Sequence, residues 1–153
     1  MATNTSYKPQ FYVVALGLAE ARAAFPLIRT IAPDVNFDDW LDYVRRRGRE
    51  GGLIGLYGES GIIVGLGSYR LGERLSHGRV LALDDFVTFE LSQAAPARAA
   101  LIAAAEERAR VLGCTRIEVR TGAHGFVDAR SPKASGWLGL GLSMDSVILA
   151  KSI

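Results

Sequence analysis

The sequence predicts one α/β domain over residues 1–153, more fully an α+β arrangement in which a single mixed, largely antiparallel sheet carries helices on both faces. The chain has 153 residues, of which 49% are hydrophobic and 22% charged, typical of one globular domain. Apolar strand-like segments alternate with segments of helical periodicity. Three strand-like segments in succession favour antiparallel pairing, and the strand–helix–strand unit that follows favours a parallel pair.

The first third of the chain predicts a short strand and two amphipathic helices. Asn36, followed by Asp38 and Asp39, has the pattern of an N-cap with an acidic first turn. The glycines at 48, 51 and 52 are expected to end the second helix. The expected ranges are 11–16 for the strand and 18–30 and 37–47 for the helices.

The remainder predicts five more strands around one long helix. Gly113 supplies the expected stop of that helix. The segment around residues 131–141 contains several glycines and predicts a poor helix or a loop. The expected strands are 53–57, 62–70, 79–89, 114–121 and 143–151, and the helix is 96–112.

Composition excludes several classes of protein. One cysteine, Cys114, excludes an internal disulfide and a cysteine-rich metal site. A net charge of +2 argues against nucleic acid as a partner, and the arginines of residues 45–49 are expected to be solvated. No apolar run is long enough for a membrane span, and no secretory leader is visible. A cytoplasmic protein without a metal or membrane partner is expected.

The stretch Val80–Thr121 carries a family resemblance. It reads VLALDDFVTF, an interruption, AALIAAAEERARVLGC and then TRIEVRTG, and the earlier FPLIRTIAP and LIGLYGESGIIVGLGSYRL fit the same pattern. This resembles the GNAT superfamily of acyl-CoA-dependent N-acetyltransferases. The resemblance implies the GNAT-like fold and acetyl transfer from acetyl-CoA to an amine of a small molecule or peptide, and it is compatible with a homodimer.

The resemblance also implies cofactor contacts. In that family a strand backbone pairs with pantetheine, and a glycine-bearing loop at a helix start binds pyrophosphate. Pro96 and Arg98 occupy the two glycine positions here. Ala95 is a poor N-cap, so the first amides of the helix are expected to lack a side-chain acceptor and to bind phosphate or water. The implied contacts are Phe86, Val87 and Thr88 for pantetheine, and Gln93, Ala97, Arg98 and Ala99 for pyrophosphate.

Asp85 is the candidate catalytic base. Asp84 and Asp85 are adjacent in a strand and are expected to point to opposite faces. One of them can orient the amine or accept its proton, although an ion pair with Arg70 or Arg79 is the simpler interpretation.

Three further aromatic residues, Phe25, Trp40 and Tyr43, are either acceptor contacts or core residues. Trp137 stands where many family members have a proton-donating tyrosine, and is expected to be a packing residue. Because the loop and this position both depart from the family pattern, the alternative hypothesis is a catalytically inactive GNAT-fold binding or regulatory module.

Overall fold

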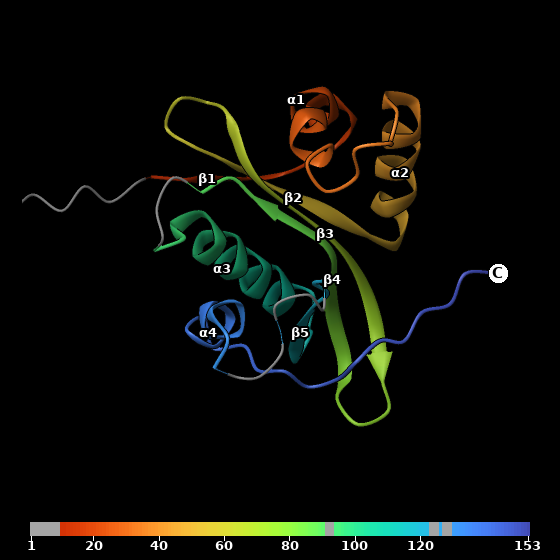
Figure 1. Cartoon of the computed structure of the whole chain (residues 1–153). Coiled ribbons are helices and arrows are strands. Elements are labelled where there is room, and N and C mark those ends of the chain that lie inside the picture. Colours follow the sequence, from red (N-terminus) through yellow and green to blue (C-terminus); the bar gives the residue numbers. More distant parts are fainter. Residues whose placement is uncertain (1–9, 91–93, 123–125, 127–129) are drawn as a thin grey trace, which may run out of the picture. The chain divides into compact units, whose positions relative to one another are not determined.

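The computed structural model describes residues 10–90, 94–122, 126 and 130–153 (Figure 1). The chain divides into two compact units, Met1–Thr121 and Gly122–Ile153. The first unit contains the sheet and three helices, and the second contains one short helix. Among the described residues, no helix is long and apolar enough to cross a membrane.

The first unit is built on a five-stranded sheet in the order β1-β2-β3-β4-β5. The first four strands are antiparallel neighbours, and β5 lies parallel to β4. The predicted mixed, largely antiparallel sheet is therefore confirmed. The strands are β1 Tyr12–Ala15, β2 Gly51–Tyr57, β3 Ile63–Arg74, β4 Gly78–Thr88 and β5 Arg116–Val119.

Helices cover both faces of this sheet, with α1 and α2 on one face and α3 on the other (Figure 1). Their bounds are α1 Leu18–Ile28, α2 Phe37–Glu50 and α3 Pro96–Val111. Asn36 caps α2 as predicted, because its Oδ1 accepts the amide of Asp39 at 2.9 Å. The predicted end of α2 is wrong, since the helix runs through Gly48 to Glu50. Gly51 instead begins β2, where a Cβ would lie 2.1 Å from the Tyr69 carbonyl oxygen.

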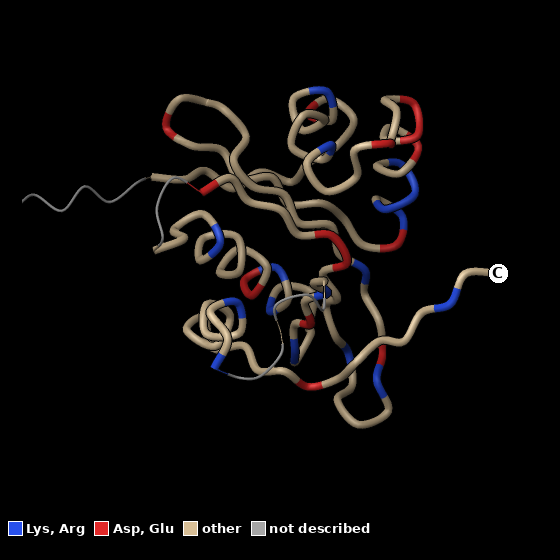
Figure 2. The backbone as a smooth tube through the Cα atoms, in the orientation of Figure 1, with Lys and Arg blue, Asp and Glu red and all other residues tan. Residues whose placement is uncertain are grey.

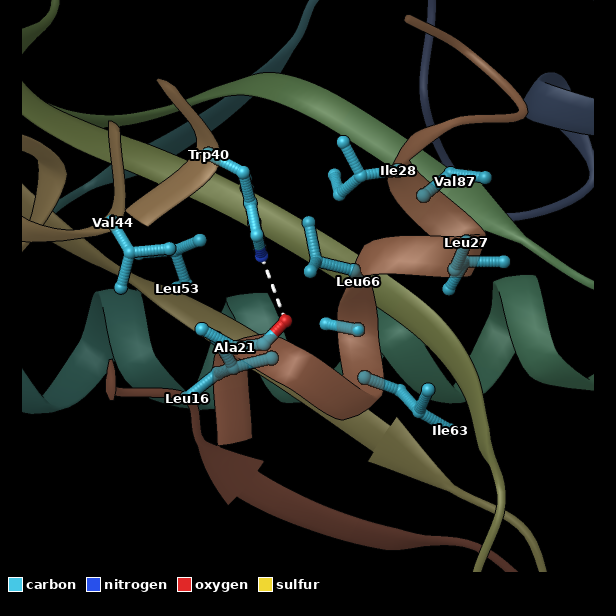
Figure 3. Close-up of a cluster of buried hydrophobic side chains, with 11 residues drawn as sticks. Leu16, Ala21, Leu27, Ile28, Trp40, Val44, Leu53, Ile63, Leu66 and Val87 are labelled. Atoms are coloured by element: carbon cyan, nitrogen blue, oxygen red, sulfur yellow. Dashed lines mark hydrogen bonds between the residues drawn. The ribbon is translucent and has the colours of Figure 1, made fainter. Parts of the chain in front are cut away.

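The core between the sheet and the first two helices is centred on Trp40 (Figure 3). Its side chain is 2% exposed, and its indole N–H donates to the Ala21 carbonyl at 2.7 Å. Phe25 packs edge-on against Phe37 with ring centroids 5.3 Å apart. Trp40 is therefore a core residue, and Phe25 is a partly buried residue that packs against the core.

The second unit differs from its prediction in two ways. Residues 132–138 form helix α4 (Pro132–Leu138), which Ser131 caps by accepting the amide of Ala134 at 3.2 Å. Proline at the first helical position and a serine cap compensate for the glycines. Trp137 is buried, as expected of a packing residue. The strand predicted over 143–151 does not form, and this segment is exposed. A strand requires a neighbour for its backbone groups, which sequence periodicity does not supply.

Candidate active site

A β-bulge in β4 creates the candidate site. Ser68 pairs with Asp85, whereas the next residue of β3, Tyr69, pairs with Leu83, so Asp84 is the extra residue. A bulge interrupts the alternation of side chains. Asp84 contacts Arg47 and Asp85 contacts Tyr43, both from α2. The predicted opposite orientation of the two aspartates is therefore wrong, because both reach the α2 side of the sheet. Figure 2 shows this acidic stretch on β4 and the basic residues along α2.

Asp85 is held through only one of its carboxylate oxygens. The Tyr43 hydroxyl and the Ser68 hydroxyl both donate to Oδ2, the latter at 2.7 Å. Arg47 donates to the Tyr43 oxygen through Nε and Nη2 at 3.2 and 3.0 Å. No described residue bonds to Oδ1 of Asp85. The carboxylate is thus fixed in orientation with one oxygen left for a ligand.

Tyr43 is a proton donor to this carboxylate at neutral pH. Burial of its hydroxyl raises the pKa of Tyr43, and the hydrogen bond to Asp85 raises it further, while Ser68 and Arg47 partly offset the shift. The phenol therefore stays protonated well above neutrality. Tyr43, one of the predicted acceptor contacts, lies beside the candidate base.

Asp84 has a different environment, surrounded by three guanidinium groups. Its Oδ1 accepts from Arg70 Nη2 at 3.0 Å, and its Oδ2 accepts from Arg70 Nε and from Arg47 Nη1, the latter at 3.0 Å. Arg120 Nη2 lies 3.9 Å from Oδ1. Burial alone would raise the pKa of Asp84, but Arg70 above all, with Arg47 and Arg120, holds it below its usual value. The predicted ion pair with Arg70 thus forms at Asp84 and not at Asp85.

The edge of β4 that faces β5 has a described strand partner only over its first half. The parallel pairing ends at Leu83 with Val119, and the last backbone bond runs from the Arg120 amide to the Leu83 carbonyl at 2.8 Å. Beyond Leu83, β4 pairs with β3 alone among the described strands. The segment Phe86–Thr88, predicted to bind pantetheine, lies on this second half of the strand.

The start of α3 holds a carboxylate that the sequence did not predict. Glu90 accepts the amide of Ala97 at 3.3 Å and the amide of Arg98 at 2.6 Å. The amide of Ala99 bonds to the Ala95 carbonyl at 3.2 Å. The expectation that these amides lack a side-chain acceptor is therefore wrong for Ala97 and Arg98, whereas the amide of Ala99 has only a backbone partner among the described residues. Gln93, the remaining predicted pyrophosphate contact, lies outside the described residues.

Three residues of the candidate site are absent from the sequence prediction, namely Glu90, Arg47 and Ser68. Glu90 precedes Pro96 by six residues, a spacing that no capping motif contains. Arg47 belongs to the basic run that was expected to be solvated, yet its side chain is 11% exposed. Of these three residues, Ser68 is the one that the sequence could have indicated, because a small polar residue interrupts an apolar strand. The structure buries it fully, so its hydroxyl requires a hydrogen-bond partner.

Comparison with known proteins places the fold. No family model and no curated protein matches this sequence. Many solved structures are similar to the structure of this chain. The aminoglycoside N-acetyltransferase AAC(6')-Iy in complex with CoA has a TM-score of 0.78 at 12% identity, over 97% of this chain and 98% of that chain.

Two further solved structures are similar over almost their whole length. The ribosomal-protein-alanine N-acetyltransferase of Brucella melitensis biovar Abortus 2308 has a TM-score of 0.71 at 15% identity, over 94% of this chain and 100% of that one. A GNAT family acetyltransferase of Staphylococcus aureus has 0.69 at 14% identity, over 94% and 98%. The chain therefore has the fold of GNAT acetyltransferases.

Proposed function

We propose that this protein is an acetyl-CoA-dependent N-acetyltransferase that acetylates an amine of a small molecule or peptide in the cytoplasm. The observation that carries the proposal is the arrangement at β4. Its edge beyond Leu83 has no second described strand beside it, and the half-bonded carboxylate of Asp85 lies on the same stretch. This arrangement occurs in a fold whose solved examples include an acetyltransferase bound to CoA.

The second half of β4 suits an extended ligand that pairs like an added strand. The Phe89 amide donates to the Val64 carbonyl in β3 at 2.7 Å, so Phe89 directs its backbone groups toward β3. Since these groups alternate along a strand, Thr88 directs its N–H and C=O toward the other edge. The amides of pantetheine are suitable partners there. The backbone groups of Val87 point toward β3, where Val87 pairs with Leu66, so Val87 offers no backbone hydrogen bond to the ligand.

The start of α3 fits a pyrophosphate only in competition with Glu90. Successive amides at a helix N-terminus bind anions, and those of Ala97 and Arg98 already bind one carboxylate. We infer that pyrophosphate takes the place of this carboxylate on the same two amides. Ala99 has no amide left for the ligand, because that group is bonded within the helix.

The chain's own residues then perform the proton transfer. Acetyl-CoA supplies a thioester carbonyl carbon that bonds to the amine nitrogen as the carbon–sulfur bond breaks and the thiolate leaves. Asp85 accepts the proton of the amine at Oδ1. Tyr43 and Ser68 hold Asp85 through Oδ2 and so fix the direction of Oδ1. A thiol with a pKa of about 8.5 is a fair leaving group without a protein acid. The reaction therefore does not require a proton-donating tyrosine at position 137, where this chain has a buried tryptophan.

The second candidate, a GNAT-fold module without catalysis, is favoured by one observation. Glu90 occupies the amides that a cofactor phosphate would need. If this carboxylate is a permanent cap, the helix start has lost its cofactor role, and the fold serves to bind a partner.

Calorimetric titration with acetyl-CoA, followed by turnover assays on a panel of amines, separates the two functions. We expect binding by the wild-type protein, equal binding by D85N, and a turnover by D85N that is lower by about 10²–10⁴. D42N is the matched control, because Asp42 is an exposed carboxylate that, among the described residues, forms an ion pair with Arg45. No binding at millimolar acetyl-CoA would support the module and contradict the enzyme.

A further inference from the structure

We propose that the acceptor carries an anionic group, a carboxylate or a phosphate, a few bonds from its amine, and that Arg70 and Arg120 bind this group while Asp85 binds the amine. The inference rests on the proposed function and adds the chemical class of the acceptor. It follows from the way the guanidinium groups around Asp84 are used.

Arg120 has donors that the described part of the chain does not use. Its guanidinium lies 3.9 Å from Asp84 Oδ1, which is within reach of a charge interaction but too far for a hydrogen bond. Its side chain makes no hydrogen bond to any described residue and is 54% exposed. The charge is therefore held at one place by Asp84, and its N–H groups remain available.

Asp84 does not need Arg120 for its own hydrogen bonding. Arg47 and Arg70 already donate three hydrogen bonds to its two oxygens. The side chain of Arg47 is only 11% exposed, and it also forms an ion pair with the exposed Glu50 at 3.4 Å. Three guanidinium groups thus lie around one carboxylate, and the side chains of two of them, Arg70 and Arg120, are 44% and 54% exposed.

Arg70 and Arg120 are close enough to bind a single anion. Their Nη2 atoms lie 3.0 and 3.9 Å from the same oxygen, Oδ1 of Asp84. Arg70 uses Nε and Nη2 on that carboxylate and keeps Nη1 for another acceptor. Paired guanidinium groups with spare donors favour carboxylate and phosphate, which accept several N–H groups at once.

The bulge places the two aspartates next to each other on one side of the sheet. Asp84 and Asp85 are consecutive residues, with Cα atoms about 3.8 Å apart, and both reach the α2 side of the sheet. An amine on Asp85 Oδ1 is thus close to an anion on the two arginines. An α-amino acid, whose carboxylate is bonded to the carbon that carries the amine, has this close spacing, whereas in a hexosamine phosphate most of the sugar ring separates the amine from the phosphate. Two nearby guanidinium groups disfavour an acceptor with several amino groups.

Matched amines test the inference. We would titrate wild-type protein, with and without CoA, with an α-amino acid and its carboxamide, with a hexosamine phosphate and the free hexosamine, and with a polyamine. We expect one anionic member to bind about ten- to hundredfold more tightly than its neutral counterpart. Which pair shows the difference distinguishes a carboxylate from a phosphate. Equal binding within both pairs, or a preference for the polyamine, would overturn the inference.

The variant R120Q locates the effect. We expect it to raise the Kd and KM of the anionic acceptor about tenfold, to leave its kcat unchanged, and to leave the neutral counterpart unaffected. R45Q is the control, since Arg45 is an exposed arginine that pairs with Asp42. Loss with both members of a pair would contradict a role in anion binding. Failure of the proposed function is a separate result, namely no acetyl-CoA binding and no acetylation of any amine, and the acceptor titrations are read independently of it.

Discussion

At the scale of single residues, two identical neighbours have different physical roles. Asp84 is 10% exposed and bonded by Arg47 and Arg70 through both oxygens. Asp85 is bonded by two neutral hydroxyls through one oxygen. A carboxylate whose charge is already neutralised is a structural element, whereas one with an open oxygen can receive a ligand. The assignment of Asp85 as the base rests on this difference.

The ion pairs of Asp84 predict an acid-sensitive contribution to stability. The pKa of Asp84 is lowered in the folded protein, so its contribution is present above the unfolded value of about 3.9 and is lost as the pH falls through the folded value. We expect D84N to lower the free energy of unfolding by about 2 kcal/mol at pH 7, at the low end for a buried pair because Arg70 is half-exposed. The difference from wild type should shrink below pH 4.

Urea unfolding of both proteins at several pH values between 3 and 7 measures this contribution. D42N, which removes an exposed pair, should change stability by less than about 1 kcal/mol at every pH. A difference between D84N and wild type that stays constant down to pH 3 would contradict the assigned ion pairs.

At the scale of elements, the carboxylate of Glu90, which follows β4 in the chain, occupies the N-terminus of α3. Pro96 begins the helix without an amide hydrogen, and Ala95 offers no side-chain cap. The Glu90 carboxylate supplies the missing acceptor and the negative charge that a helix N-terminus favours. A phosphate on the same amides must displace it, so Glu90 stabilises the helix at the cost of cofactor affinity.

The variant E90Q tests this competition. Removing the charge should weaken the helix by about 0.5–1 kcal/mol and tighten CoA binding about three- to tenfold, because the ligand displaces a weaker competitor. Calorimetry measures the affinity and urea unfolding the stability. E107Q, at an exposed glutamate of the same helix, should change neither by as much. Weaker CoA binding by E90Q would show that Glu90 assists the ligand.

At the scale of the whole molecule, the C-terminal residues contribute no regular secondary structure. Residues 143–153 form no helix or strand and are exposed, including Val147 at 83% and Leu149 at 92%. Exposed side chains bury no apolar area, so this segment contributes little to stability. By contrast, Ala134 and Trp137 in α4 are buried.

Truncation distinguishes these segments. A chain ending at Leu142 should keep its melting temperature within about 2 °C, whereas W137A should lose several kcal/mol because it leaves a large cavity. Differential scanning calorimetry of both proteins measures the difference. A marked fall in melting temperature on truncation would mean that the segment packs as a strand, as its sequence pattern predicts.

The sequence by itself determined the helices and strands of the first unit and their order, because periodicity and caps such as Asn36 act over a few residues. Its resemblance to a known family also indicated the fold, which the solved structures support, and predicted Phe86–Thr88 as cofactor contacts. Only the tertiary structure decided how the charged residues meet. The bulge turned Asp84 and Asp85 to one side, and the fold brought Arg47, Arg120 and Glu90 to partners between 8 and 37 residues away. Such contacts depend on the register of neighbouring strands and the path of a loop, which no local pattern encodes.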